Sequence, residues 1–375
     1  MNKKSMRSIV TVAVLLCLTL TSLILTACDG GKNEMEQDMS VDLKSDVGLY
    51  FWGDEGGNAV RYSENIGAEL FDKNKPTIIF FHGWMPDEDK NTADINYTFA
   101  TTPASQKKGV GYTDYAARLR SEGYNVGAMY WAKHAQSLTD LFEYIWIDFK
   151  GQKHSLACIF AKEYAKCFGG YSGEMTFMGH SFGAQASTAT AYMLYKMKEK
   201  GLVSAETSLP TRITVADPYI GDLAISDKSL LNKNVDNIEE SIGGRIPAAL
   251  TADVIEYLSN KGVVSDIYCG MPIAYDQFSE NDTVKRNAII DKLHKNSVWT
   301  VLEGLQSAYG KVGDIHNLTL DWVALSLFVV KEGDDGERYP TAGLDTASMK
   351  ELIGKEYKST YKGLDLEEEM LEEVE

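Results

Sequence analysis

A serine flanked by glycines, in the pentapeptide Gly-His-Ser-Phe-Gly at 179–183, is the pattern in this sequence with the clearest chemical meaning. It follows a short apolar run at 175–178 and precedes a segment at 184–200 with apolar residues at helical spacing. A serine at such a turn is held in a strained backbone conformation that lifts its hydroxyl clear of the sheet. Glycines two positions before and after it avoid Cβ clashes between strand and helix. The pattern predicts a nucleophile at Ser181.

Strand-like and helix-like segments alternate along the chain. Strands are expected at 48–52, 59–63, 77–81, 124–131, 175–178, 212–216 and 263–268. Helices are expected at 112–122, 138–149, 156–168, 184–200, 252–259, 281–299 and 318–330. Apolar strands separated by helices indicate an α/β protein with a mostly parallel sheet and helices on both faces. The first two strands, joined by a turn-rich connection, indicate an antiparallel edge.

These features together resemble the α/β-hydrolase fold and, among its members, lipases and related esterases. Four of them carry the resemblance: Phe-His-Gly-Trp at 81–84 after an early strand, the serine turn, Val-Ala-Asp-Pro at 215–218 after a later strand, and His316 near the C-terminal end. The order serine, acid, histidine is that of the family. The resemblance covers roughly residues 48–330 and implies an α/β-hydrolase fold with possible lid insertions.

A serine hydroxyl needs a base to take its proton, and the chain has six histidines. His316 is preferred because it follows all the expected strands and lies in a loop, residues 313–317, before a helix. His180 lies beside the serine and points away from it. His82 belongs to the loop after an early strand, and His294 lies on an expected surface helix. His134 and His154 precede the serine, against the family order.

Two aspartates compete for the role of the acid that orients the base. Asp217 directly follows the strand 212–216 and has the lipase-like Asp-Pro pattern, so it is preferred. Asp266 lies near the later strand, after which the acid of this fold usually comes. The resemblance also implies that the backbone N–H groups of Trp84 and Phe182 bind the oxyanion, and that the bulky Trp84 lines an apolar acyl pocket.

The N-terminus has the pattern of an export signal, with three bases before an uncharged run at 9–27. The run ends in Leu-Thr-Ala-Cys, which resembles the bacterial lipobox and implies that Cys28 is lipidated. An uncleaved transmembrane anchor is the alternative, because nineteen uncharged residues could span a bilayer. We expect a signal peptide at 1–27, a lipid-anchored tether at 28–46, a catalytic domain at 47–335 and an acidic extension at 336–375. The protein is then extracytoplasmic and held at a bacterial cell membrane.

The formal net charge is −17, and removing residues 1–27 with their three bases makes it −20 (−17 − 3). Electrostatic binding to nucleic acid is therefore not expected. Cys158 and Cys167 lie in one expected helix, about 13 Å apart, too far for a disulfide. With Cys269, they are expected to be free buried thiols. The sequence has no Cys-x-x-Cys or His-x-x-x-His pair, so no metal or other cofactor is expected.

These observations predict a serine hydrolase of carboxylic esters, with lipid esters as the favoured substrates. An acetyl or feruloyl esterase acting on polysaccharides is an alternative, because the three catalytic residues do not encode the alcohol half of the ester. A surface lipoprotein that binds without catalysis is another. Two polar segments that follow strand ends, residues 85–111 and 219–250, are candidate lids. Protein partners are not predicted.

Overall fold

The computed structural model describes residues 47–63, 66–67, 69–85, 98–107, 111–146, 149, 154–219, 247–270, 283–303, 312–328 and 346–360. The predicted signal peptide, the tether and Cys28 lie outside the described residues. Within the described part, none of the helices combines the length and apolar character needed to span a bilayer.

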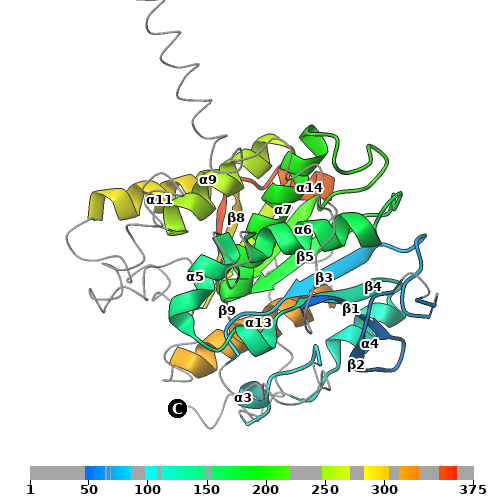
Figure 1. Ribbon diagram of the computed structural model, residues 1–375. Helices are drawn as coiled ribbons and strands as arrows, with labels where there is room; N and C mark the ends of the chain where they lie inside the picture. Colours follow the sequence, from blue (N-terminus) through cyan, green and yellow to red (C-terminus); the bar gives the residue numbers. More distant parts are fainter. Residues whose placement is uncertain are drawn as a thin grey trace, which may run out of the picture.

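Nine strands of the described chain form one sheet in the order β2-β1-β4-β3-β5-β6-β7-β8-β9 (Figure 1). Their bounds are β1 (Gly48–Gly53), β2 (Gly56–Arg61), β3 (Thr77–Phe81), β4 (Asn125–Tyr130), β5 (Met175–His180), β6 (Arg212–Ala216), β7 (Val264–Cys269), β8 (Val298–Glu303) and β9 (Glu356–Thr360). β1 runs antiparallel to β2 and β4, and every other neighbouring pair is parallel. The predicted parallel sheet with an antiparallel edge is confirmed.

Helices cover both faces of the sheet (Figure 1). One face carries α5 (Leu138–Trp146), α6 (Leu156–Cys167), α7 (Phe182–Glu199), α9 (Pro247–Asn260) and α11 (Thr283–Asn296). The other carries α4 (Tyr115–Ser121) and α13 (Val312–Phe328), with the short α3 (Pro103–Gln106) against α13. A further short helix, α14 (Thr346–Lys350), packs against β7. The protein has the mostly parallel α/β sheet with helices on both faces that its sequence predicts.

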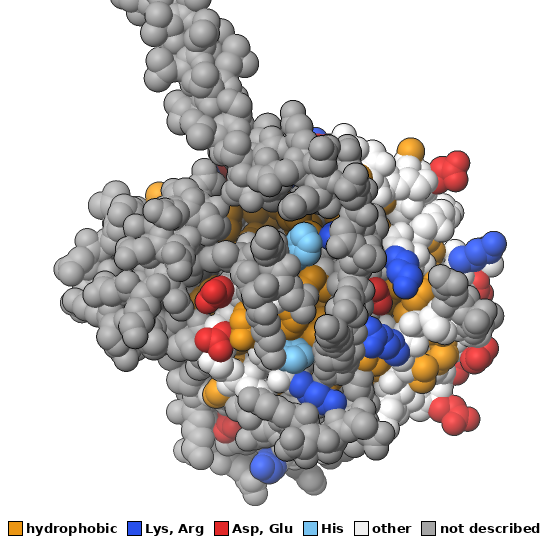
Figure 2. All heavy atoms as spheres, in the orientation of Figure 1, with side chains coloured by type: hydrophobic (Ala, Val, Ile, Leu, Met, Phe, Trp, Pro, Cys, Tyr) orange, Lys and Arg blue, Asp and Glu red, His pale blue; other side chains and the backbone are white. Residues whose placement is uncertain are grey.

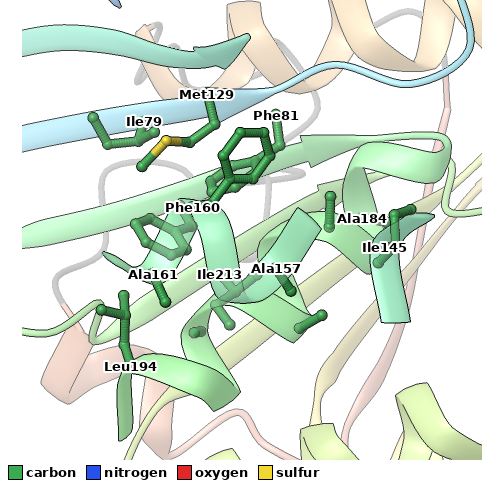
Figure 3. Packing of buried hydrophobic residues seen from close by; sticks show 14 of the residues in the cluster. Ile79, Phe81, Met129, Ile145, Ala157, Phe160, Ala161, Ala184, Leu194 and Ile213 are labelled. Carbon is green, nitrogen blue, oxygen red and sulfur yellow. The ribbon is translucent and has the colours of Figure 1, made fainter. Parts of the chain in front are cut away.

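The central strand β3 supplies side chains to two hydrophobic cores, one on each face of the sheet. Ile79 and Phe81 enter the core beneath α6 and α7, whereas Ile78 and Phe80 enter the core beneath α4 and α13. Figure 3 shows Phe81 beside Phe160 of α6, with their ring centroids 5.9 Å apart. An apolar run without polar alternation is thus buried on both faces, as a strand in the middle of a parallel sheet must be.

Both signs of charge occur on the surface of the described residues. On the face drawn in Figure 2, acidic and basic side chains are interspersed, and the described residues there form no continuous acidic surface. Part of the net negative charge comes from the tail at 365–375, which has seven acids and no base and lies outside the described residues.

Two expectations about the C-terminal third are wrong. The helix expected at 281–299 ends at Asn296, and Val298 begins β8, because the β-branched and aromatic residues of that segment fit a sheet better than a helix. The sheet also does not end at residue 335. β9 pairs in parallel with β8, so part of the expected acidic extension belongs to the sheet of the main domain.

The described part of the first candidate lid is packed into the protein. Phe99 is buried and stacks on Phe80 with ring centroids 4.5 Å apart. The backbone N–H and the hydroxyl of Thr102 donate to the buried carboxylate of Asp321 in α13, at 3.1 and 2.9 Å. Residues 98–107 are therefore fixed and do not form a free cover. The second candidate lid, 219–250, ends in the first turn of α9. Residues 86–97, 108–110 and 220–246 of the two candidate lids lie outside the described residues.

A buried ion pair joins β6 to β7. Arg212 donates from Nη2 and Nε to the two carboxylate oxygens of Asp266, at 2.7 and 3.2 Å, and the Thr214 hydroxyl donates to the same carboxylate. Asp266 is fully buried in the middle of β7. Removing one member of such a pair leaves the other charge uncompensated in a dry environment.

We therefore expect Asp266→Asn to lower the free energy of unfolding by about 3–5 kcal/mol. Asp253→Asn is the control, because it breaks the half-exposed pair with Lys292, whose atoms lie 2.6 Å apart, and should cost about 0–1 kcal/mol. Urea unfolding measures both values. Equal losses in the two variants would contradict a structural role for Asp266.

Candidate active site

Three chain turns converge at the carboxyl ends of β3, β5 and β6. The register pairs Phe81 with Gly179 and His180 with Ala216, so the residues that follow these strands lie side by side. β3 has β4 on one side and β5 on the other, so the direction of winding reverses there. The crevice at such a reversal is where open α/β sheets bind ligands.

Ser181 occupies a strained turn between β5 and α7. Its backbone has φ 58° and ψ −124°, which a residue with a side chain adopts at a cost of about 1–3 kcal/mol. Neighbouring backbone holds it in place, because Ser181 N–H donates to the Ala216 carbonyl and Tyr219 N–H donates to the Ser181 carbonyl, at 3.2 and 3.1 Å. A Cβ at Gly183 would collide with the carbonyl oxygen of Phe81. The predicted turn is therefore present, and its glycine at 183 is needed for close packing.

Asp217 and His316 form a short hydrogen bond next to this turn. His316 Nδ1 lies 2.6 Å from Asp217 Oδ2, and the other carboxylate oxygen accepts the Gly270 N–H at 3.0 Å. The Asp217 side chain is fully buried, whereas the His316 side chain is 21% exposed. Since Nδ1 donates to the carboxylate, Nε2 is the nitrogen left to accept a proton. The carboxylate thus orients the ring and selects its tautomer.

The structure places the competing acid and base candidates differently. Asp266 faces Arg212 and Thr214 in the middle of β7 and is not the partner of His316. His316 itself lies within α13, which begins at Val312, and not in the expected loop before a helix. The Ser181 hydroxyl makes no hydrogen bond with a described residue. Catalytic contacts of this kind often tighten only when substrate binds.

His82 organises the loop that follows β3. Its Nε2 accepts the Trp131 N–H at 3.0 Å, and its Nδ1 donates to the Gly83 carbonyl at 3.0 Å. Burial lowers the pKa of His82 to about 4, so the ring is neutral at neutral pH and can serve both contacts. The sequence assigned His82 to this loop but did not reveal that the ring joins it to the end of β4.

The same loop is tied to the segment after β4 at two further points. The Trp84 indole N–H donates to the Gln136 carbonyl at 2.8 Å, and Met85 N–H donates to the Ala135 carbonyl at 2.8 Å, just after the short 3-10 turn Ala132–His134. Among described residues, neither Trp84 N–H nor Phe182 N–H has a hydrogen-bond acceptor. Phe182 directly follows Ser181, and Trp84 directly follows Gly83, which packs against Ser181.

Aromatic side chains surround the start of α7. Phe182 is buried and lies between Tyr219 and Phe142 of α5, with ring centroids 4.4 and 5.0 Å away. Gln185, one turn further along α7, accepts the Trp146 indole N–H and donates to the Tyr219 carbonyl. The backbone N–H of Phe182 is thus held by packing of its own side chain.

The described residues contain no group of three His, Cys, Asp or Glu side chains placed to hold a metal ion. Cys158, Cys167 and Cys269 are buried thiols, as predicted.

No family model matches the sequence, and no curated protein matches it. Several solved structures align with most of this chain. Esterase B from Lactobacillus rhamnosis, inhibited by a tributyrin phosphonate, is 14% identical, with 90% of this chain and 100% of that chain covered and a TM-score of 0.35. The esterase Est2 from Thermogutta terrifontis is 13% identical, covering 79% and 93% at a TM-score of 0.34.

A hormone-sensitive lipase from a metagenome library is 13% identical, covering 82% of this chain and 96% of its own at a TM-score of 0.32. Identities and TM-scores this low say nothing of activity. The candidate active site is therefore defined by the sheet order and by the geometry around Ser181.

Gly83 offers a direct test of this geometry. A Cβ there would lie 2.6 Å from Ser181 Cβ and 2.9 Å from the His180 carbonyl oxygen, so Gly83→Ala must push the loop away from the serine. We expect kcat/KM for p-nitrophenyl butyrate to fall roughly 100-fold. Gly111→Ala is the control, since nothing lies within 4 Å of its Cβ, and should keep parental activity. Parental activity in Gly83→Ala would show that this loop takes no part in the reaction.

Proposed function

We propose that this protein is a serine hydrolase of carboxylic esters. The observation that carries the proposal is the 2.6 Å hydrogen bond from His316 Nδ1 to buried Asp217, formed beside Ser181 in its strained turn. A histidine oriented by a carboxylate next to a serine raised above a sheet is the arrangement that activates a hydroxyl for acyl transfer.

The reaction proceeds through an acyl-enzyme. Ser181 Oγ attacks the ester carbonyl while His316 Nε2 takes its proton. The resulting oxyanion accepts hydrogen bonds from the backbone N–H groups of Trp84 and Phe182. His316 then protonates the departing alkoxide, and an acyl ester of Ser181 remains. Water attacks this ester with His316 again as the base, which releases the acid and restores the serine. Asp217 stabilises the imidazolium that forms on His316.

We further propose that the acyl half of the substrate is apolar, as in a lipase or lipase-like esterase. Aromatic rings lie next to both proposed oxyanion donors: Phe142 and Tyr219 pack against Phe182, and the Trp84 side chain is 43% exposed. Polysaccharide-type esterases are the alternative. p-Nitrophenyl esters of increasing chain length separate the two, because an acetyl esterase prefers the shortest ester and a lipase-like enzyme the longer ones.

The three residues should act as one unit. We expect Ser181→Ala and His316→Ala each to lower kcat by roughly 10⁴ to 10⁶, with the double variant little worse than either. Asp217→Asn should lower kcat by about 10⁴, because His316 is no longer held in the correct tautomer although the proton acceptor itself remains. Ester hydrolysis at saturating substrate measures the effects, and melting temperatures near the parental value identify them as catalytic. Full activity in Ser181→Ala would show that hydrolysis does not depend on this serine, whereas a parental protein without ester hydrolysis would be a binding protein on a hydrolase scaffold.

We also propose that the mature protein is an extracytoplasmic lipoprotein, with its signal peptide at 1–27, its lipid on Cys28 and a tether to residue 46. The sequence Leu-Thr-Ala-Cys after an uncharged run supports this proposal. In a bacterial host, wild type should partition with membranes as the processed form, and Cys28→Ala should remain unprocessed. Processing and anchoring of Cys28→Ala like wild type would exclude Cys28 as the lipidation site.

A further inference from the structure

We propose that His180 is a positioning residue that fastens the helix carrying His316 to the nucleophile turn. The proposal depends on the proposed function, since it concerns how the catalytic base is held. His180 is the last residue of β5 and directly precedes Ser181. The sequence indicated no role for His180, because its side chain was expected to point away from the serine.

Two contacts join His180 to α13. Its Nε2 donates to the backbone carbonyl of His316 at 3.1 Å, and the two imidazole rings lie 4.4 Å apart between centroids with 35° between their planes. A carbonyl oxygen has two lone pairs, so the His316 carbonyl can accept His180 and still serve its own helix. His180 is 8% exposed, so the donor is shielded from competing water.

The contact acts at a different point from the bond to Asp217. Asp217 fixes the His316 ring at Nδ1, whereas His180 fixes its backbone. Five residues along α13, Asp321 accepts the Tyr115 hydroxyl at 2.8 Å and thereby holds a later turn of the helix. Without His180, the backbone of the turn that bears His316 would lose its hydrogen bond to the end of β5, and Nε2 could drift from Ser181.

The charge state of His180 suits this role. Burial, together with the nearby His316, lowers the pKa of His180 well below its ordinary value, so the ring is neutral when His316 takes the serine proton. A second positive charge at this separation would oppose formation of the imidazolium. His180 therefore does not compete for the proton.

Two amide variants of different length test the hydrogen bond. Gln places its amide nitrogen near the position of His Nε2 and keeps a donor for the His316 carbonyl, whereas the shorter Asn does not reach it. With p-nitrophenyl butyrate, we expect His180→Gln to keep kcat within about threefold and His180→Asn to lower it by roughly 10- to 100-fold, with KM changed less than twofold in both. His180→Phe, which keeps a ring but has no donor, should resemble His180→Asn.

Parental kcat in both His180→Asn and His180→Phe, with Ser181→Ala inactive, would overturn the positioning role and leave the proposed function intact. Equal losses in His180→Gln and His180→Asn would also overturn it, because the donor would not then be the relevant feature. If His180→Asn does not fold, the comparison of His180→Gln with His180→Phe decides in the same way. Full activity in Ser181→Ala would instead remove the proposed function itself.

Discussion

The close approach of three backbone segments at one edge of the sheet is the constraint on which the rest of the site depends. The turn at Ser181, the loop after β3 and the start of α7 meet so tightly that side chains at Gly83 and Gly183 would collide with their neighbours. This packing holds Ser181 at a positive φ, a conformation that an isolated chain would abandon. The free energy of the two surrounding cores therefore maintains the strained turn at Ser181.

Electrostatic arrangement around this turn follows from burial. Asp217 is buried with both oxygens hydrogen-bonded, one to the Gly270 backbone N–H and the other to His316 Nδ1. The Asp266 carboxylate is also buried, but it faces Arg212 and contributes to the sheet and not to the site. These two carboxylates belong to neighbouring strands but differ in their contacts, because Asp217 lies just past the end of β6 and Asp266 lies within β7.

Much of the fold and of the candidate site could be predicted from the sequence, because the patterns that specify them are local. The serine turn, its flanking elements and the aspartate after β6 each follow from a few adjacent residues. Contacts between distant segments were not readable: His82 to Trp131, Trp84 to Gln136 and His180 to the His316 carbonyl join residues far apart in the chain. β9 was missed because its five residues, Glu356–Thr360, are mostly polar and gain their stability from pairing with β8.

The most direct measurement of the central claim is the site at which an active-site probe reacts. A fluorophosphonate forms a stable bond only with an activated hydroxyl, so the protein should gain the mass of one adduct, and peptide mass spectrometry should place it on Ser181. Labelling should be lost in His316→Ala, which keeps the serine but lacks its base. An adduct on another residue, or undiminished labelling of Ser181 in His316→Ala, would contradict the account.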